Sequence, residues 1–343
     1  MSWDNSDRPV FSLRLYLEYL VYLAFRIIEE LICAIPGDKS ALAVGRFFGR
    51  IMFIAASERR NVAIENLTIC FGDSRDSKEI RRLARANFEH FGMLSVEFYR
   101  LRRWSEDELA KRLVIKGKSN FDFAWSPGNV GLYYVTGHFG SFEVLAAMSR
   151  FMGIKGNLLV TSVPNYFVNK HMIFERGGAK SGLKILPHRG SVHKILQALG
   201  SGEMVVVLAD QRGDDTRPTI VDFFGRKVFA NGIFAKFAIE SNALVFPIRG
   251  TRLDDGRYEC EFGAEIPIQR TGDIQNDLAV NSQRFHLVFE SWLRENPEQG
   301  FWMHRKFKRK RKKTSQRASE QLINFSIQQG HAGSEAKGRN EGF

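Results

Sequence analysis

Cysteine is scarce in this 343-residue sequence, and the three that occur, Cys33, Cys70 and Cys260, lie far apart. Their spacing matches no metal site and no disulfide framework, which favours reduced thiols in a cytosol-facing protein. The sequence also lacks the G-x-S-x-G turn and the G-x-x-x-x-G-K-[ST] loop. These absences argue against a covalent serine nucleophile and against nucleotide hydrolysis.

A long uninterrupted apolar run is missing as well. Residues 10–36 are rich in Leu, Tyr, Phe and Ile, but charges interrupt them, and the longest charge-free run there is Tyr19 to Phe25. A spanning helix needs about 20 apolar residues, so an amphipathic helix in a membrane interface fits better. A second apolar stretch, residues 41–57, is broken by Arg46 and Arg50 and strengthens this interpretation. The alternative is a core helix of a soluble domain.

Positive charge is present but unevenly placed. The net charge is +12, and residues 305–313, RKFKRKRKK, carry eight cationic side chains without an acid, so the rest of the chain is only modestly basic. Such a run is usually a solvated tail, and its possible partners are nucleic acid, anionic lipid or an acidic protein. Phe307 alone interleaves its charges, which gives little support to stacking on nucleic acid.

The order of the expected elements indicates an α/β fold. Residues 10–115 have a mostly helical pattern, as in the segment 77–92. Apolar strands at 129–136, 156–162, 182–187, 203–210, 243–252 and 257–265 then alternate with helices at 141–153, 164–177, 191–202, 231–243 and 277–296. This alternation predicts a mixed, mostly parallel sheet flanked by helices, preceded by amphipathic or membrane-associated helices. We expect three regions: a helical membrane-associated region (1–115), an α/β core (116–304) and a basic, disordered tail (305–343).

The stretch GHFGSFE, residues 137–143, contains the main catalytic candidate. It follows a strand and precedes a helix for which Ser141 is a plausible N-cap, and open α/β sheets collect ligands at such points. His138 lies in the turn and Glu143 in the first helical turn. If the turn folds back, Glu143 would accept one ring N–H and make the other nitrogen of His138 a general base. A satisfied loop histidine remains the alternative.

The sequence gives weaker support for a function of the other polar residues. Asp210 to Asp215, in the loop after an apolar strand, could hold a metal, although the spacing fits no calcium loop and a merely polar loop is the simpler reading. His188, His193 and His304 lack local ligand partners and are expected to be surface or structural residues. We therefore expect neither a metal nor a bound cofactor.

The His-x₄-Glu pair resembles the signature of glycerolipid acyltransferases, and the wider pattern is similar to the lipid A late acyltransferase family. The likeness covers roughly residues 10–310. Besides the His-x₄-Glu pair it rests on five blocks, Arg59 to Phe71, Leu186 to Gly190, Ala209 to Gln211, Asp222 to Arg226 and Pro297 to Lys308. The departures are Ala209 for proline, Lys306 for arginine and the long basic end.

This resemblance implies an acyltransferase with a glycerolipid acyltransferase-like core. His138 would take the proton of a hydroxyl on a lipid A precursor, Glu143 would hold His138, and the hydroxyl would attack an acyl carrier protein thioester. Arg189 would bind the oxyanion or a phosphate of the acceptor, and Asp210 would support Arg189 or a neighbouring loop. The N-terminal helix would dock the enzyme at the cytoplasmic face of the inner membrane. The basic residues from Arg305 onward would attract acidic acyl carrier protein or anionic lipid.

Two alternatives remain open at this point. One is an acyltransferase for another acceptor, such as a lysophospholipid, a glycolipid or an aminolipid, because the His-x₄-Glu pair serves any hydroxyl. The other is a non-catalytic membrane or nucleic-acid binding protein that acts through its basic tail.

Overall fold

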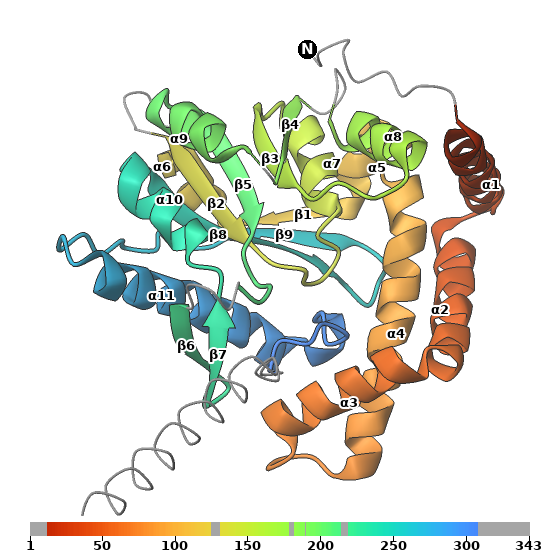
Figure 1. The fold of residues 1–343 in the computed structure, drawn as a ribbon. Helices are drawn as coiled ribbons and strands as arrows, with labels where there is room; N and C mark the ends of the chain where they lie inside the picture. Colours follow the sequence, from red (N-terminus) through yellow and green to blue (C-terminus); the bar gives the residue numbers. More distant parts are fainter. Residues whose placement is uncertain (1–11, 125–130, 178–181, 189, 214–218, 308–343) are drawn as a thin grey trace, which may run out of the picture. The chain divides into compact units, whose positions relative to one another are not determined.

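The computed structural model describes residues 12–124, 131–177, 182–188, 190–213 and 219–307. Its centre is a seven-stranded sheet with the order β1-β9-β8-β2-β5-β3-β4, in which only the β8–β9 pair is antiparallel. Helices flank this sheet (Figure 1), and five of the described helices, α1 to α5, precede its first strand in sequence. The predicted fold class, a mixed and mostly parallel α/β sheet behind N-terminal helices, is therefore confirmed.

The helices are α1 (Leu13–Ala34), α2 (Asp38–Ala55), α3 (Ser57–Phe71), α4 (Ser77–Arg100), α5 (Glu106–Arg112), α6 (Lys118–Ala124), α7 (Val144–Phe151), α8 (Tyr166–Arg176), α9 (Val192–Gly200), α10 (Ile233–Ser241), α11 (Ile274–Glu295) and the 3₁₀ turn η2 (Pro297–Gln299). The sheet strands are β1 (Leu113–Lys116), β2 (Leu132–Thr136), β3 (Gly156–Val160), β4 (Leu183–Pro187), β5 (Met204–Leu208), β8 (Leu244–Arg252) and β9 (Tyr258–Phe262). β6 (Thr219–Phe223) and β7 (Arg226–Ala230) form a separate hairpin.

The central strands are apolar on both sides because both faces of the sheet are covered. All five residues of β2 are buried, and they alternate between two cores. Tyr133 and Val135 join the core that α9, α10 and α11 cover, whereas Leu132 and Tyr134 join the core that α5, α6 and α7 cover. Even-numbered residues of β2 therefore face α7. Because side chains alternate along a strand, this pattern also determines that Thr136, at the end of β2, faces the α7 side of the sheet.

Glycines set the close packing of α2 against α4. A Cβ atom on Gly49 would lie 2.3 Å from the carbonyl oxygen of Phe88, and one on Gly92 would lie 2.1 Å from that of Gly45. Only hydrogen in place of a side chain permits this approach of two backbones. α2 runs along α4 in Figure 1, so α2 is packed on the rest of the molecule through α4.

Three local expectations differ from the structure. β1 lies inside the region expected to be helical and pairs with β9, so the boundary expected at residues 115/116 falls within a strand. The β6–β7 hairpin was not anticipated. Ser141 is not the N-cap of α7, because that helix begins at Val144 and the Ser141 hydroxyl donates elsewhere. The described residues up to Phe307 belong to one compact unit.

The N-terminal helices carry exposed apolar side chains. Over the described ranges, no helix taken alone has both the length and the apolar character to cross a bilayer; α2 and α3 reach that level only together, across a 94° bend. Large apolar residues are nevertheless exposed along α1 and α2, among them Leu17, Val21, Ile28, Phe47 and Ile54.

Candidate active site

Strand register brings His138 and Asp210 together. β2 and β5 are parallel neighbours, and Thr136 at the end of β2 is aligned with Leu208 at the end of β5. His138 and Asp210 each lie two residues beyond these ends, at the same edge of the sheet. Their side chains meet there, with 2.9 Å between Nδ1 of His138 and Oδ1 of Asp210.

Two glycines of the turn are needed for this geometry. A Cβ atom on Gly137 would lie 3.0 Å from the Cβ of Asp210, so a side chain at this position would push the two loops apart. Gly140 has φ of +60°, and a Cβ there would lie 2.0 Å from the carbonyl oxygen of Gly250. The left-handed conformation and the close approach both favour glycine.

A buried polar network holds the turn of residues 137–143 through Gly140 and Ser141. Glu97 on α4 accepts from the Ser141 hydroxyl at 2.7 Å and from the Tyr258 hydroxyl at 3.1 Å, and Arg252 binds both of its oxygens. Burial and the Arg252 charge hold the pKa of His90 well below its ordinary value. Neutral His90 therefore donates from Nε2 to the Gly140 carbonyl and accepts from Arg252 at Nδ1.

Glu143 does not hold His138, contrary to the sequence-based expectation. Its Oε1 accepts from Arg176 Nη2 at 2.5 Å, and its Oε2 lies 3.3 Å from Arg176 Nε and 3.4 Å from Arg102 Nη2. Glu143 is only 8% exposed, and two guanidinium groups occupy its oxygens. The carboxylate at Nδ1 of His138 comes instead from Asp210, which was expected only to support Arg189 or a loop.

The electrostatics of the pair follow from this contact. Burial by itself would lower the pKa of His138, but the charge and hydrogen bond of Asp210 outweigh it, and the pKa of His138 is raised. Burial disfavours the charged form of Asp210, yet the interactions with His138 and Lys306 lower its pKa to about 2. Asp210 is thus ionised and accepts the Nδ1–H of His138, which leaves Nε2 as the basic nitrogen.

A second cation and a second histidine lie behind Asp210. Lys306 Nζ donates to the carbonyl oxygen of Asp210, lies 3.2 Å from His286 Nε2 and 4.5 Å from the centre of the Phe223 ring. Burial lowers the pKa of Lys306 to about 8 and, together with the Lys306 charge, that of His286 to about 3. Neutral His286 donates from Nδ1 to the Ser282 carbonyl and accepts from Lys306.

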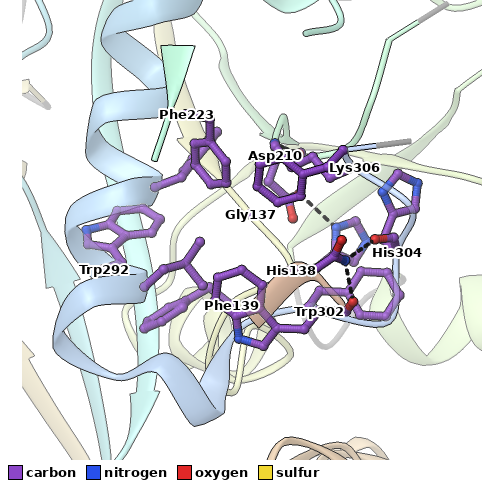
Figure 2. A pocket seen from close by; sticks show the side chains of 14 residues that line it. Gly137, His138, Phe139, Asp210, Phe223, Trp292, Trp302, His304 and Lys306 are labelled. Atoms are coloured by element: carbon purple, nitrogen blue, oxygen red, sulfur yellow. Dashed lines mark hydrogen bonds and ion pairs between the residues drawn. The ribbon is translucent and has the colours of Figure 1, made fainter. Parts of the chain in front are cut away.

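Figure 2 shows this region, with Phe223 and Trp292 to one side and Asp210, Lys306 and His304 to the other. The space between them is a cavity of only about 40 Å³ beside His138.

A much larger cavity, about 730 Å³, opens on the α7 face of the sheet. His138, Phe142, Glu143 and Arg176 line one part of it. Apolar side chains of the strands and α7 line the rest, including Leu145, Met148, Leu158, Val206, Leu208 and Ile248. Its volume suits a ligand of substantial size, and its walls suit a hydrocarbon chain. His138 thus places its imidazole at the wall of a mainly apolar cavity.

The other residues singled out in the sequence lie partly inside and partly outside the described ranges. Arg189 lies outside the described residues, as do Asp214 and Asp215 of the loop considered for a metal. His188 lines the large cavity, and His193 is exposed on α9. Among described His, Cys, Asp and Glu side chains, the group spaced for a metal is Glu29, His171 and Glu175, but Arg26 lies 2.6 Å from Glu29 and 3.3 Å from His171, which disfavours a cation there.

Sequence reasoning missed the roles of Lys306, Arg176 and Arg102. Lys306 was assigned to the basic tail, but it is directed inward to Asp210, while Phe307 packs against Phe223. The signal available was the aromatic block before it, FWMH, because aromatic residues next to a cation indicate packing rather than a solvated run. Arg102 and Arg176 had no local signal, since their partner Glu143 is distant in sequence.

A family model described as bacterial lipid A biosynthesis acyltransferase matches residues 10–309. A search of curated proteins gives no match to the sequence.

Proposed function

Because the chain belongs to the family of bacterial lipid A biosynthesis acyltransferases, we propose that His138 is its general base and acyl carrier protein its acyl donor. Membership of this family makes the chain an acyltransferase and sets the non-catalytic alternative aside. The observation that carries the proposal is the 2.9 Å contact between His138 and Asp210 at the wall of the large apolar cavity.

The proposed reaction needs no acyl-enzyme. Nε2 of His138 takes the proton of a hydroxyl on the lipid A precursor while that oxygen attacks the thioester carbonyl. The resulting tetrahedral intermediate expels the thiolate of acyl carrier protein, which takes the proton from Nε2, so an ester and a free thiol are formed. Asp210 stabilises the imidazolium through Nδ1 and fixes its tautomer.

Glu143 acts in this proposal through the arginines it binds. It holds Arg176 in the wall of the cavity that contains His138, and it contributes to the raised pKa of His138. Arg189 stays a proposed ligand of the oxyanion or of an acceptor phosphate. A guanidinium is suited to either task because it offers several charge-assisted donors.

The exposed apolar residues of α1 and α2 support attachment to the membrane. An amphiphilic acceptor must be reached from the bilayer, and we propose that these helices dock the enzyme at the cytoplasmic face of the inner membrane. The net charge of +12 favours encounter with acidic acyl carrier protein.

The test is transfer by purified protein from an acyl carrier protein thioester to a lipid A precursor. His138→Ala should lower the rate by about 10² to 10⁴, as expected for loss of a positioned base. His193→Ala, an exposed histidine on α9, is the matched control and should leave the rate unchanged. Near-normal turnover by the His138→Ala protein would overturn the assignment.

The acceptor is tested separately. Lipid A of a deletion strain should lack one secondary acyl chain. Unchanged lipid A together with loss of an acyl chain from a phospholipid, glycolipid or aminolipid would assign the enzyme to that other acceptor.

A further inference from the structure

A second large cavity, of about 690 Å³, lies beside the proposed active site. Four arginines line it: Arg26 on α1, Arg102 and Arg103 between α4 and α5, and Arg150 on α7. Three glutamates also contribute to its walls, so the lining is polar and carries one net positive charge. Its size matches that of a ligand site rather than a packing defect.

The arginines are positioned by the fold rather than spread over a flexible surface. Arg150 donates to the backbone carbonyls of Arg102 and Trp104, at 3.0 and 2.7 Å. Arg26 contacts the buried Glu29 at 2.6 Å, so that acid is already neutralised. Arg103 is about half exposed and pairs with Glu30, also half exposed, at 2.7 Å. Such a surface pair is weak and can yield to a better anion.

Arg102 has unused hydrogen-bonding capacity. It is 13% exposed; its Nη2 lies 3.4 Å from Glu143 and its Nε lies 4.0 Å from Glu175. Its Nη1 finds no acceptor among the residues that the structure describes. Buried donors normally have partners, and because Nη1 is itself buried, a phosphate in the cavity would satisfy it only when the guanidinium turns toward the cavity.

Two neighbouring features bear on what this cavity binds: the exposed apolar residues of α1 and the contact of Arg102 with Glu143. Ile27, Ile28 and Leu31 are exposed on α1, the helix that also contributes Arg26 to the cavity, so one helix carries both apolar surface and a cation of the cavity wall. Arg102 also binds Glu143, which lines the cavity of His138. A molecule with an anionic headgroup and hydrocarbon chains could therefore contact both regions.

We propose that this arginine-lined cavity binds a phosphate group on the headgroup of the lipid acceptor. Guanidinium groups match phosphate oxygens through paired, charge-assisted hydrogen bonds, and four of them surround one hollow. This inference rests on the proposed function, because it assigns the cavity to the lipid whose hydroxyl reaches His138. It adds a positioning subsite that no residue of the His-x₄-Glu motif supplies directly.

The test measures binding, so that it does not depend on turnover. Neutral detergent micelles containing phosphatidic acid, the same micelles containing diacylglycerol, and inorganic phosphate are titrated into the full-length protein. The variants are Arg103→Gln, with Arg103→Lys as the charge-retaining form, and Arg257→Gln as the matched control. Arg257 is likewise exposed and paired at 2.7 Å with an exposed acid, Asp255.

We expect phosphatidic acid to bind the wild-type protein about 10-fold or more tightly than diacylglycerol, and Arg103→Gln to remove most of that preference. Arg103→Lys should retain part of it, and Arg257→Gln should retain all of it. Equal binding of the two lipids, or an unaffected Arg103→Gln protein, would overturn the proposal. If inorganic phosphate binds as tightly as phosphatidic acid, the ligand is not a lipid headgroup, and the cavity is instead a site for the free phosphate ion.

The same titration with His138→Ala separates this inference from the proposed function. Retained selectivity for phosphatidic acid in a protein that no longer transfers acyl chains supports both. Selectivity with undiminished transfer would refute the role of His138 and leave the phosphate site standing.

Discussion

At the scale of single residues, the partner of His138 is the main result. The motif spacing pointed to Glu143, five residues away, whereas the structure pairs the imidazole with Asp210, 72 residues away. The two acids have different roles: Asp210 contacts the ring, whereas Glu143 binds Arg102 and Arg176. The charge of Arg176 lowers the pKa of His138, and the charge of Glu143 opposes this effect. Both are expected to matter for activity, for different physical reasons.

Replacing Asp210 with Asn should change the pH dependence of transfer. Asp210 raises the pKa of His138, so its neutral replacement lowers that pKa. The acid limb of kcat/KM, which reports deprotonation of the base, should move to lower pH, while the maximal rate falls because the imidazolium loses its counter-charge. The measurement is a pH profile from pH 5 to 9. An acid limb that stays in place would show that Asp210 does not set the basicity of His138.

Replacing Glu143 with Gln should affect stability as well as rate. Arg102 and Arg176 would then remain largely buried without their carboxylate, and breaking a buried ion pair on one side typically costs about 3 to 5 kcal/mol. Denaturant unfolding measures this loss. The exposed Asp255, replaced by Asn, is the control and should unfold as the wild type does. A Glu143→Gln protein of normal stability that fails in transfer would instead favour a direct role in the reaction.

At the scale of elements, the sequence predicts where the strands lie along the chain better than it predicts which strands are neighbours in the sheet. Apolar runs such as residues 204–208 identify buried strands because both faces of the sheet are covered. Nothing in those runs says that β2 lies next to β5, and that adjacency is what brings His138 to Asp210. The β6–β7 hairpin was missed because its exposed polar residues, such as Asp222 and Lys227, dilute the apolar pattern.

The α2–α4 contact gives a test at this scale. Gly92→Ala would place a methyl group against the backbone of α2 and should destabilise the protein by about 1 to 3 kcal/mol through overpacking. Gly200→Ala, at the end of α9 with open space around the added atom, should be neutral or slightly stabilising. Thermal or denaturant unfolding distinguishes the two. Equal stability of both variants would mean that α2 can move away from α4 without cost.

At the scale of the whole molecule, the exposed apolar residues of α1 and α2 and the large apolar cavity are the features that support the proposed attachment to the membrane. The sequence indicated an interfacial N-terminus from its broken apolar runs, and the structure places exposed apolar residues on α1 and α2. The sequence could not reveal the cavities, because their walls come from segments distant in sequence. The basic run after Phe307 lies outside the described residues.

The proposed attachment to the membrane predicts how the protein is extracted. Detergent should release it from membranes, whereas high salt alone should not, because apolar contact is not screened by ions. Ile28→Asp should weaken binding to vesicles of bacterial lipid in a flotation assay. Ile220→Asp, a comparably exposed isoleucine on the β6–β7 hairpin, is the matched control and should float normally. Release of the wild-type protein by salt would refute apolar anchoring.

The inward position of Lys306 has a consequence for how the enzyme is made. Lys306 is joined to the backbone of Asp210, yet it follows that residue by 96 positions. A ribosome adding 5 to 20 residues per second would need about 5 to 20 s to cover that interval. A growing chain can thus display its exposed apolar helices well before Lys306 reaches Asp210, the partner of His138, so the proposed attachment to the bilayer would precede completion of the surroundings of this pair.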